Sequence, residues 1–498
     1  MARLSGPKRR EKQKKIRAKN SNASDIRSIK ITSNKDKGKK VDVSTSTVRL
    51  QYYESILQDA LQVSVAFVDS GNSVRDGLKK KTVVEGLPIV PNGKENVLLK
   101  FFDNSDEVIE LTMYLNDYDV LSTDSTKELV TLQLCSKEFL TNEDVRINER
   151  FDGPISEHVK LIITDEKYLN SDKDIDIEDT QGDTNFTGRN KKPFFTLNKL
   201  AQKSVPEGAP KGNSAGFFFF ETSEGFKFKS IDSFFGQEAK KAFIFNQTPD
   251  MGGESIPEGY DGKALTYETT NKVNAQKKDA MGAYNTRIKT FDSYRMKYTE
   301  SFIDSQGKEI KMGGKELPKS NEEFDKDNKY TRTVYKVKDT GSLNSGSGTG
   351  KSQEQLKKSG DENLEIEKVV NQSIMRYNQL FAAMTTITIP GDFTLHAGDA
   401  IWVDAVSKQE EVCADDVDKK SGGLYVIADL CHYLSQKQTL TKLNLIRDST
   451  GRDASKRKRA ISSSTSKPAK SETAPDVISS FAKRRNARRG GEFSKVVK

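Results

Sequence analysis

The sequence has few cysteines, and their spacing excludes two kinds of site. Only three occur in 498 residues, at Cys135, Cys413 and Cys431. Cysteines this far apart indicate neither a disulfide framework nor a paired-cysteine metal site. We therefore expect the chain to fold in a reducing compartment and to hold no metal.

Histidine is equally scarce. None of His158, His396 and His432 has a nearby Cys, Ser or second His at ligand or triad spacing. Partners from distant parts of the fold stay open. The carboxylates are too numerous for a catalytic pair to be chosen from the sequence. We predict no catalytic residue, no cofactor and no enzymatic activity.

Long apolar runs are absent. Apolar residues make up 34% of the chain, against about 45–50% (a figure that includes Gly) in typical globular proteins. No run reaches the roughly 18 apolar residues of a membrane span, and the N-terminus lacks the apolar stretch of a signal peptide. We expect no integral membrane segment, and we expect part of the chain to lie outside any core.

Charge is distributed unevenly. Residues 1–20 carry nine Lys/Arg and one acid, and residues 451–498 carry fourteen Lys/Arg and four acids. Because the whole chain has a net charge of only +9, the stretch between these basic tails is acidic. Such tails serve as nucleic-acid arms, targeting signals or docking strands for an acidic protein surface. Stacking aromatics are not interleaved with the basic clusters, so any nucleic-acid binding would be independent of sequence.

Alternating apolar residues predict a first β domain. In 61–71, Leu61, Val63, Val65 and Phe67 fall on one face of a half-buried strand. The same pattern recurs over 97–102, 108–115 and 129–135. The short connections between these runs favour antiparallel pairing in a small barrel or sandwich.

Two helices and an aromatic hairpin are expected next. Pro154 and Pro193 stand at helix starts, where a missing N–H costs nothing. The stretch SAGFFFFETSEGFKFKSIDSFF (214–235) then has four successive phenylalanines, which predict a strand covered on both faces. After a turn at 221–225, phenylalanines alternate with Lys227 and Lys229. This alternation indicates a strand with one buried face and one solvent-exposed face. The candidate core or interface residues are Phe217, Phe218, Phe219, Phe220, Phe226 and Phe228.

The C-terminal half predicts an insertion and a second β domain. Residues 305–364 are rich in Gly, Ser, Lys and Glu and are interpreted as a flexible insertion with one possible short strand, TRTVYKV. Within it, GSGTGKS has Ser345 where a phosphate-binding loop needs Gly, so we interpret it as linker. The acidic run near 172–183 has Ile177 where a calcium loop needs Gly and is interpreted as a solvated loop. Alternating strands return between 385 and 448.

Four stretches in order resemble the baseplate central hub proteins of contractile-tail bacteriophages. They are LQYYESILQDALQVSVAFVDSGN, SKEFLTNEDVRINERFDGPISEHVKLII, KPFFTLNKLAQKS with the aromatic hairpin, and ITIPGDFTLHAGDAIWV. That family is related to late-control D proteins and to the N-terminal domains of type VI spike proteins. The resemblance covers residues 45–450 apart from the insertion.

The resemblance implies a mainly β fold with an α/β middle (α+β), in which two similar antiparallel β-barrel tube domains flank a helix-plus-hairpin region. Composition and resemblance together divide the chain into a basic arm (1–45), a first tube domain (46–150), a middle domain (151–304), the insertion (305–364), a second tube domain (365–450) and a disordered basic tail (451–498). The basic arms and the insertion are departures from the family's pattern.

The resemblance also implies a function and partners. Such hubs are homotrimers that join a six-fold tail tube to a three-fold central spike, and DNA passes through their lumen without sequence-specific binding. The expected partners are the tail tube protein, the central spike protein, other baseplate components and the tape measure protein. The protein would be made in the host cytoplasm and located in the virion tail. Two alternatives stay open: a nucleic-acid-packaging protein acting through its tails, and a tail-associated cell-wall hydrolase.

Overall fold

The structure is a computed structural model that describes most of the chain between residues 25 and 457. The described residues are 25–36, 38–76, 79–89, 93–103, 107–124, 126–208, 215–245, 259–270, 274–293, 296–304, 311–317, 330–338, 366–381, 383–405, 417–418, 421–436 and 438–457. Residues 1–24 of the predicted arm (1–45), residues 458–498 of the predicted tail (451–498), Cys413 and the stretch GSGTGKS lie outside this part of the chain.

Seven strands form what we call the first β unit. They are β1 (Asp25–Thr32), β2 (Lys40–Asp42), β3 (Thr47–Ser55), β4 (Gln62–Asp69), β7 (Asn96–Phe102), β8 (Val108–Thr123) and β9 (Glu128–Cys135). Their order across the sheet is β3-β4-β9-β8-β7-β1-β2, and all neighbours are antiparallel. The predicted strands are confirmed, and Val63, Val65 and Phe67 are buried as their alternation requires.

Two features of this unit differ from the prediction. Residues 25–42, expected in a polar arm, contain β1 and β2 because Ile29 and Ile31 alternate with polar residues and are fully buried. Ser64 and Ala66, expected on a wet face of β4, are also buried. Smaller elements complete the region: η1 (Ser44–Ser46), the hairpin β5 (Val74–Asp76) and β6 (Lys79–Lys81), and α2 (Val83–Gly86).

A second group of seven strands forms the second β unit. They are β15 (Ala242–Phe245), β16 (Gly262–Lys263), β17 (Thr266–Thr270), β21 (Ala383–Pro390), β22 (Ala400–Ala405), β23 (Gly423–Ser435) and β24 (Thr439–Arg447). Their order is β17-β21-β24-β23-β22-β15-β16. All pairs are antiparallel except those of β15, which is parallel to β16 and β22. The first three strands come from the predicted middle domain, so the second unit begins earlier in the chain than 365.

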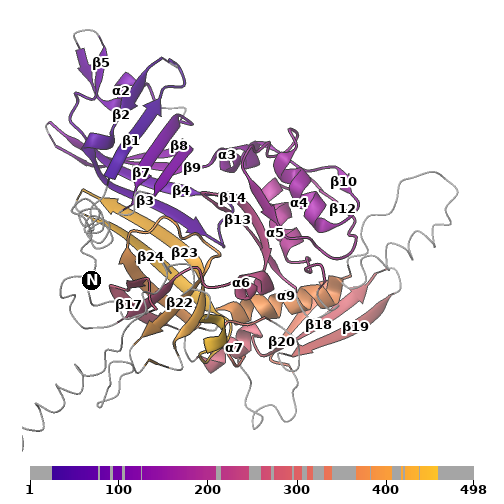
Figure 1. The fold of residues 1–498 in the computed structure, drawn as a ribbon. Coiled ribbons are helices and arrows are strands. Elements are labelled where there is room, and N and C mark those ends of the chain that lie inside the picture. The colour runs from indigo at the N-terminus through magenta and orange to yellow at the C-terminus, as the bar shows by residue number, and fades with distance from the viewer. Residues whose placement is uncertain are drawn as a thin grey trace, which may run out of the picture. The chain divides into compact units, whose positions relative to one another are not determined.

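The two β units share one 14-stranded sheet. In the seam between them, β3 pairs antiparallel with β23, from Ser55 opposite Asp429 to Arg49 opposite Ser435. The Ser55 hydroxyl donates to the Asp429 carboxylate at 2.6 Å. Figure 1 shows the indigo strands of the first unit continuing through β3 into the yellow and orange strands of the second. One apolar core runs beneath both units.

The two β units repeat the same strand order, although the first strand is antiparallel to its neighbours in the first unit and parallel to them in the second. With strands numbered by chain order inside each unit, both sheets run third, fourth, seventh, sixth, fifth, first, second. Both also have a bulge between the sixth and seventh strands, before Asp117 in β8 and before Asp429 in β23. The predicted pair of similar β units is therefore confirmed. Each unit is a curled, open sheet (Figure 1), and no pairing among the described strands closes either one alone.

The middle module lies between the units in sequence. Its elements are α3 (Lys137–Asp144), β10 (Arg150–Phe151), α4 (Ile155–Thr164), β11 (Ile175–Ile177), β12 (Phe186–Thr187), α5 (Pro193–Ala201), β13 (Phe217–Thr222), β14 (Gly225–Ser230) and α6 (Ile231–Gly236). Both predicted helices are confirmed, with Pro154 at the N-cap of α4 and Pro193 opening α5. The apolar stripe of α4 is buried against α5 and the hairpin.

A separate three-stranded sheet completes the described fold. It contains β18 (Asn285–Asp292), β19 (Lys297–Asp304) and β20 (Arg332–Val337), and α9 (Ile366–Leu380) packs against it (Figure 1). The short helix α7 (Ala275–Met281) precedes β18 and contacts α9 and β20, whereas η2 (Ala454–Arg457) follows β24 and contacts β23. The strand expected at TRTVYKV is confirmed as β20, parallel to β18. Part of the predicted insertion is thus built into the fold.

Candidate functional site

The phenylalanine-rich hairpin of β13 and β14 lies at the centre of the molecule's packing. Phe217 and Phe219 face a core formed with α4 and α5, together with Phe226 and Phe228. Phe218 and Phe220 face the opposite side, against α6, β23 and β24. Every one of these six rings is at most 8% exposed within the single chain. The strand is covered on both faces, as four successive phenylalanines predict.

Cross-strand ring contacts hold the hairpin in register. The Phe219 and Phe226 rings stack with centroids 5.5 Å apart, and the Phe217 and Phe228 rings lie 4.8 Å apart. Such aromatic pairs contribute about 0.5–1.5 kcal/mol each beyond the area they bury. The hairpin therefore forms a fixed layer between two apolar cores.

Glu221, which the sequence places in a turn, is a buried strand residue. Its carboxylate accepts from the Lys173 ammonium at 2.5 Å, the Ser136 hydroxyl at 2.6 Å and the Leu61 backbone N–H at 3.0 Å. Burial raises the pKa of Glu221, while the Lys173 charge opposes that rise. Leu61 immediately precedes β4. This carboxylate therefore connects the hairpin to the first β unit.

Gly225 at the hairpin turn is required by a close backbone approach. Its φ is +129°, and a Cβ added there would lie 2.1 Å from the Asp174 carbonyl oxygen. We expect Gly225→Ala to lower the stability by more than about 1–3 kcal/mol, because the strain of such a φ adds to the clash. Thermal unfolding would measure this. Gly182→Ala is the control, since Gly182 also has a positive φ but faces open space; equal losses in both variants would contradict the account.

A second buried carboxylate, Glu54 of β3, joins three parts of the fold. It accepts from the Tyr52 hydroxyl at 2.5 Å, from the Ser223 backbone N–H in the hairpin turn at 2.9 Å, and from the Ala397 backbone N–H at 2.9 Å. The His396 Nδ1 lies 3.3 Å from it. Burial alone would raise the pKa of Glu54, but His396, Tyr52 and Ser223 together lower it to about 2. We call Glu54, Ser223, Glu224 and His396 the junction cluster.

The junction cluster brings together the residue types of a hydrolase triad without its geometry. Both the Ser223 hydroxyl and the Glu54 carboxylate approach the same nitrogen, Nδ1 of His396, at 3.3 Å each. In a triad the serine is the partner of one ring nitrogen, and the carboxylate that holds the ring binds the other nitrogen. Here the buried Glu54 carboxylate shares the nitrogen that the serine would need. The Nε2 atom faces the half-exposed Glu224 carboxylate at 3.5 Å, and that carboxylate is itself paired with Lys227. The contacts of the cluster therefore hold three segments together and leave no ring nitrogen directed at the serine alone.

The other two histidines are structural. His158 of α4 contacts the Thr184 carbonyl at 3.1 Å, and burial lowers its pKa. His432 of β23 stacks on Tyr52 with ring centroids 5.6 Å apart, and burial lowers its pKa to about 4. Within the described ranges, no group of three His, Cys, Asp or Glu side chains is placed to hold a metal ion. No helix in that part of the chain is long and apolar enough to span a membrane.

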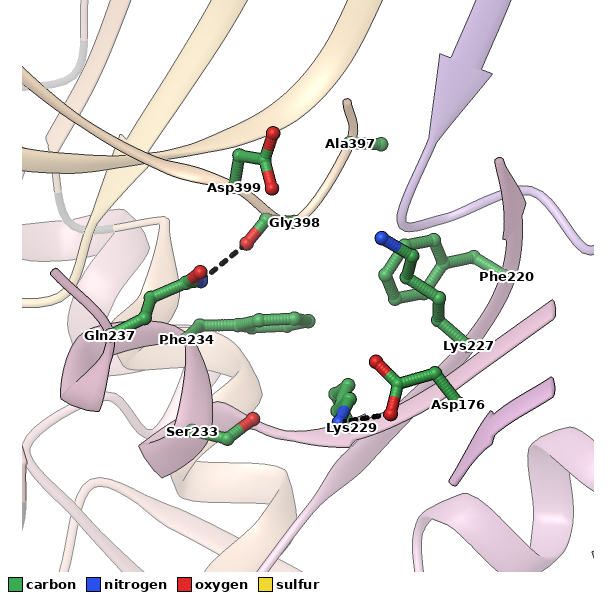
Figure 2. Close-up of a pocket in the computed structure, with 10 residues that line it drawn as sticks. All are labelled: Asp176, Phe220, Lys227, Lys229, Ser233, Phe234, Gln237, Ala397, Gly398 and Asp399. Atoms are coloured by element: carbon green, nitrogen blue, oxygen red, sulfur yellow. Dashed lines mark hydrogen bonds and ion pairs between the residues drawn. The ribbon is translucent and has the colours of Figure 1, made fainter. Parts of the chain in front are cut away.

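A hollow of about 210 Å³ lies beside the loop that carries His396, and Figure 2 shows the residues that line it. It is lined by Asp176, Phe220, Lys227, Lys229, Ser233, Phe234, Gln237, Ala397, Gly398 and Asp399. The two lysines predicted on a solvent-exposed face line it, and each is ion-paired at 2.6 Å, Lys227 with Glu224 and Lys229 with Asp176. The Gln237 side chain donates a hydrogen bond to the Gly398 carbonyl at 2.6 Å, and both residues line the hollow. The hollow therefore separates the hairpin from the 395–399 loop that the junction cluster connects.

Comparisons with known proteins complete the description. No protein-family model matches the sequence, and no curated protein matches it either. Among solved structures, the 43 kDa tail protein of prophage MuSo2 from Shewanella oneidensis is similar over 85% of this chain and 99% of its own, with 9% identity and a TM-score of 0.47. A tail protein from Neisseria meningitidis MC58 matches 86% of this chain and 96% of its own, with 7% identity and a TM-score of 0.48.

A third similar structure is an E. coli component of the type VI secretion system, described as similar to the T4 bacteriophage tail proteins gp27 and gp5. It matches 82% of this chain and 76% of its own, with 8% identity and a TM-score of 0.37. At these identities and scores, the likeness by itself carries no conclusion about what this chain does.

Proposed function

We propose that this chain is a structural component of a phage-type tail, a homotrimeric hub whose six β units form a ring around a channel. Support comes from the resemblance of the sequence to baseplate hub proteins and from the repeated β units. A junction cluster without triad geometry favours a structural role over a catalytic one.

This proposal depends mainly on two strand edges that, among the described residues, lack the partner strand that the equivalent edges have in the seam. In the seam, the second half of β23 (sixth strand of its unit) pairs with β3 (third strand of its unit). The sixth strand of the first unit is β8, and the third strand of the second unit is β17. Among the described residues, no strand pairs with either of them on the corresponding side. A second copy of the chain could therefore supply the missing partner to each.

The shared bulge gives the register of this pairing between copies. Residues 117–120 of β8 correspond to residues 429–432 of β23, because both directly follow this bulge; a second bulge in β8, between Val120 and Ser122, ends the correspondence. Thr269 of β17 corresponds to Tyr52 of β3 through their partner strands. Since Tyr52 pairs with His432 in the seam, Val120 of one chain would pair with Thr269 of the next.

Exposure of the β8 edge fits this role. Val120 and Leu121 are 45% and 59% exposed in the single chain. An exposed strand edge with apolar side chains is a template for pairing with another chain. Repeating the seam between copies would alternate first and second units around a closed ring, and three copies would give the six units that a six-fold tail tube requires.

The proposed assembly has two distinct ends. A ring of six similar β units presents six-fold-like symmetry to a tail tube protein, while three middle modules present three-fold symmetry to a central spike protein. Other baseplate components and the tape measure protein are further proposed partners. DNA would pass through the channel without sequence-specific binding.

Mass measurement of the purified full-length protein tests the proposal. We expect particles of three times the chain mass, in equilibrium with single chains at low concentration. A protein that stays a single chain at every concentration up to that used for structural work, with or without a tube or spike partner, would contradict it.

A further inference from the structure

We propose that the His396 imidazolium is a pH-sensitive pin that holds the two β units and the aromatic hairpin together, so that the joint weakens as the pH rises above neutral. The inference concerns the single chain, and it stands whether or not the chain forms a ring.

The geometry places His396 where three segments meet. Its ring lies between Glu54 of β3 and the turn residues Ser223 and Glu224, at the 3.3–3.5 Å separations of the junction cluster. These residues lie in three separate stretches of the sequence, and Glu54 and His396 are 342 positions apart. The backbone N–H of His396 donates to Asp399 at 2.9 Å, which fixes the loop that carries the ring.

The charged groups facing His396 are mostly acidic. Glu54 faces it from β3 and Glu224 from the hairpin turn, while Asp399 lies in its own loop. From β23, the neighbouring ring is His432, whose Nε2 is buried without a hydrogen-bond partner. Its pKa of about 4 keeps this ring neutral near pH 7. Two lysines compensate part of the acidic charge: Lys227 pairs with Glu224 at 2.6 Å and Lys240 with Asp399 at 2.8 Å.

Glu54 is the carboxylate that most needs the imidazolium. Its side chain is fully buried, and its other partners are a hydroxyl and two backbone N–H groups, all neutral. Removing the charge of one member of a buried pair leaves the other uncompensated, which is strongly destabilising. Loss of the His396 proton would therefore weaken the contacts that connect β3, the hairpin turn and the 395–399 loop.

The direction of the pH effect follows from the ring's surroundings. Burial lowers the pKa of His396, but the hydrogen bond and charge of Glu54, together with the charges of Glu224 and Asp399, outweigh it and raise the pKa above the usual 6.5. The stability from this pair is therefore complete below pH 6.5 and is lost as the pH rises through the folded-state pKa. His158 and His432 have lowered pKa values, so their contributions are lost in the opposite direction, as the pH falls below 6.5.

Unfolding of the full chain by denaturant between pH 6 and pH 8 tests the pin. Above pH 6.5 we expect the folding equilibrium constant of the wild type to fall by up to tenfold per pH unit, which is the effect of one proton. His396→Gln should be less stable at pH 6 and should lose this slope. His158→Gln is the matched control and should keep it, because its ring is neutral in this range. An unchanged slope in His396→Gln would overturn the proposal.

Direct titration of the wild-type protein decides the matter even if His396→Gln does not fold. The chain has only three histidines, so the ring signals can be followed individually by NMR. We expect one ring to titrate above pH 6.5 and two below it. Three rings that all titrate at or below pH 6.5 would overturn the proposal.

Discussion

Phe220→Asp is expected to prevent the chain from reaching its folded state. The Phe220 ring is fully buried between Phe234 and the backbone of Gly398. Removing a buried phenylalanine costs about 3–5 kcal/mol. Burying a carboxylate adds several kcal/mol more, because Lys227 and Lys229, which line the same hollow, are already paired with Glu224 and Asp176. The sum approaches the total stability of about 5–15 kcal/mol of a typical native protein. Soluble yield and the far-ultraviolet circular dichroism spectrum would measure the loss.

Phe195→Asp is the matched control for this substitution. Phe195 is 45% exposed on α5, and the ammonium groups of Lys191 and Lys199 lie 5.5 Å and 4.6 Å from its ring centre. A carboxylate there would stay hydrated and gain two cationic neighbours, so we expect a folded protein with a change in stability of less than about 1 kcal/mol. If Phe220→Asp were as soluble and as stable as Phe195→Asp, the hairpin would not be the internal layer described above.

Val120→Asp is expected to leave a folded single chain that no longer assembles. In the single chain this side chain is 45% exposed, so the carboxylate would remain in water. In the proposed ring it would occupy the position that buried His432 has in the seam between the two units. Burial of an unpaired carboxylate at each interface would weaken association by roughly a hundredfold or more. Sedimentation or light scattering would measure the mass.

The same strand offers the control. Val108 is 42% exposed at the other end of β8, in the half that already pairs with β7. Val108→Asp should therefore assemble like the wild type. A Val120→Asp protein with the full assembled mass, or a Val108→Asp protein that falls apart equally, would argue against pairing at the β8 edge.

Local patterns in the sequence were enough to predict several strands of each β unit, the aromatic hairpin and the helices α4 and α5 of the middle module. Period-two alternation identified β4, β7, β8 and β9, and Pro154 and Pro193 marked the helix starts. Four successive phenylalanines predicted a strand covered on both faces, because side chains on a strand alternate in direction. These signals are visible because each depends only on neighbouring residues.

The remaining features depend on contacts between distant residues. β15 and β16 are short, and β15 pairs in parallel both with β16 and with the distant β22, so no hairpin spacing indicates them. β1 was hidden because its two buried isoleucines lie in a basic stretch that reads as a polar arm. The junction cluster joins Glu54 to His396 across 342 positions. The sequence offered one local signal for this cluster, which is that the acidic residue Glu54 directly follows two tyrosines.

Electron microscopy of the purified particle tests the ring most directly. We expect a closed ring with a central hole, in which three copies of the chain contribute six similar β lobes, with first and second units alternating. A particle with two or four copies, or one in which the β lobes meet without an opening, would contradict it.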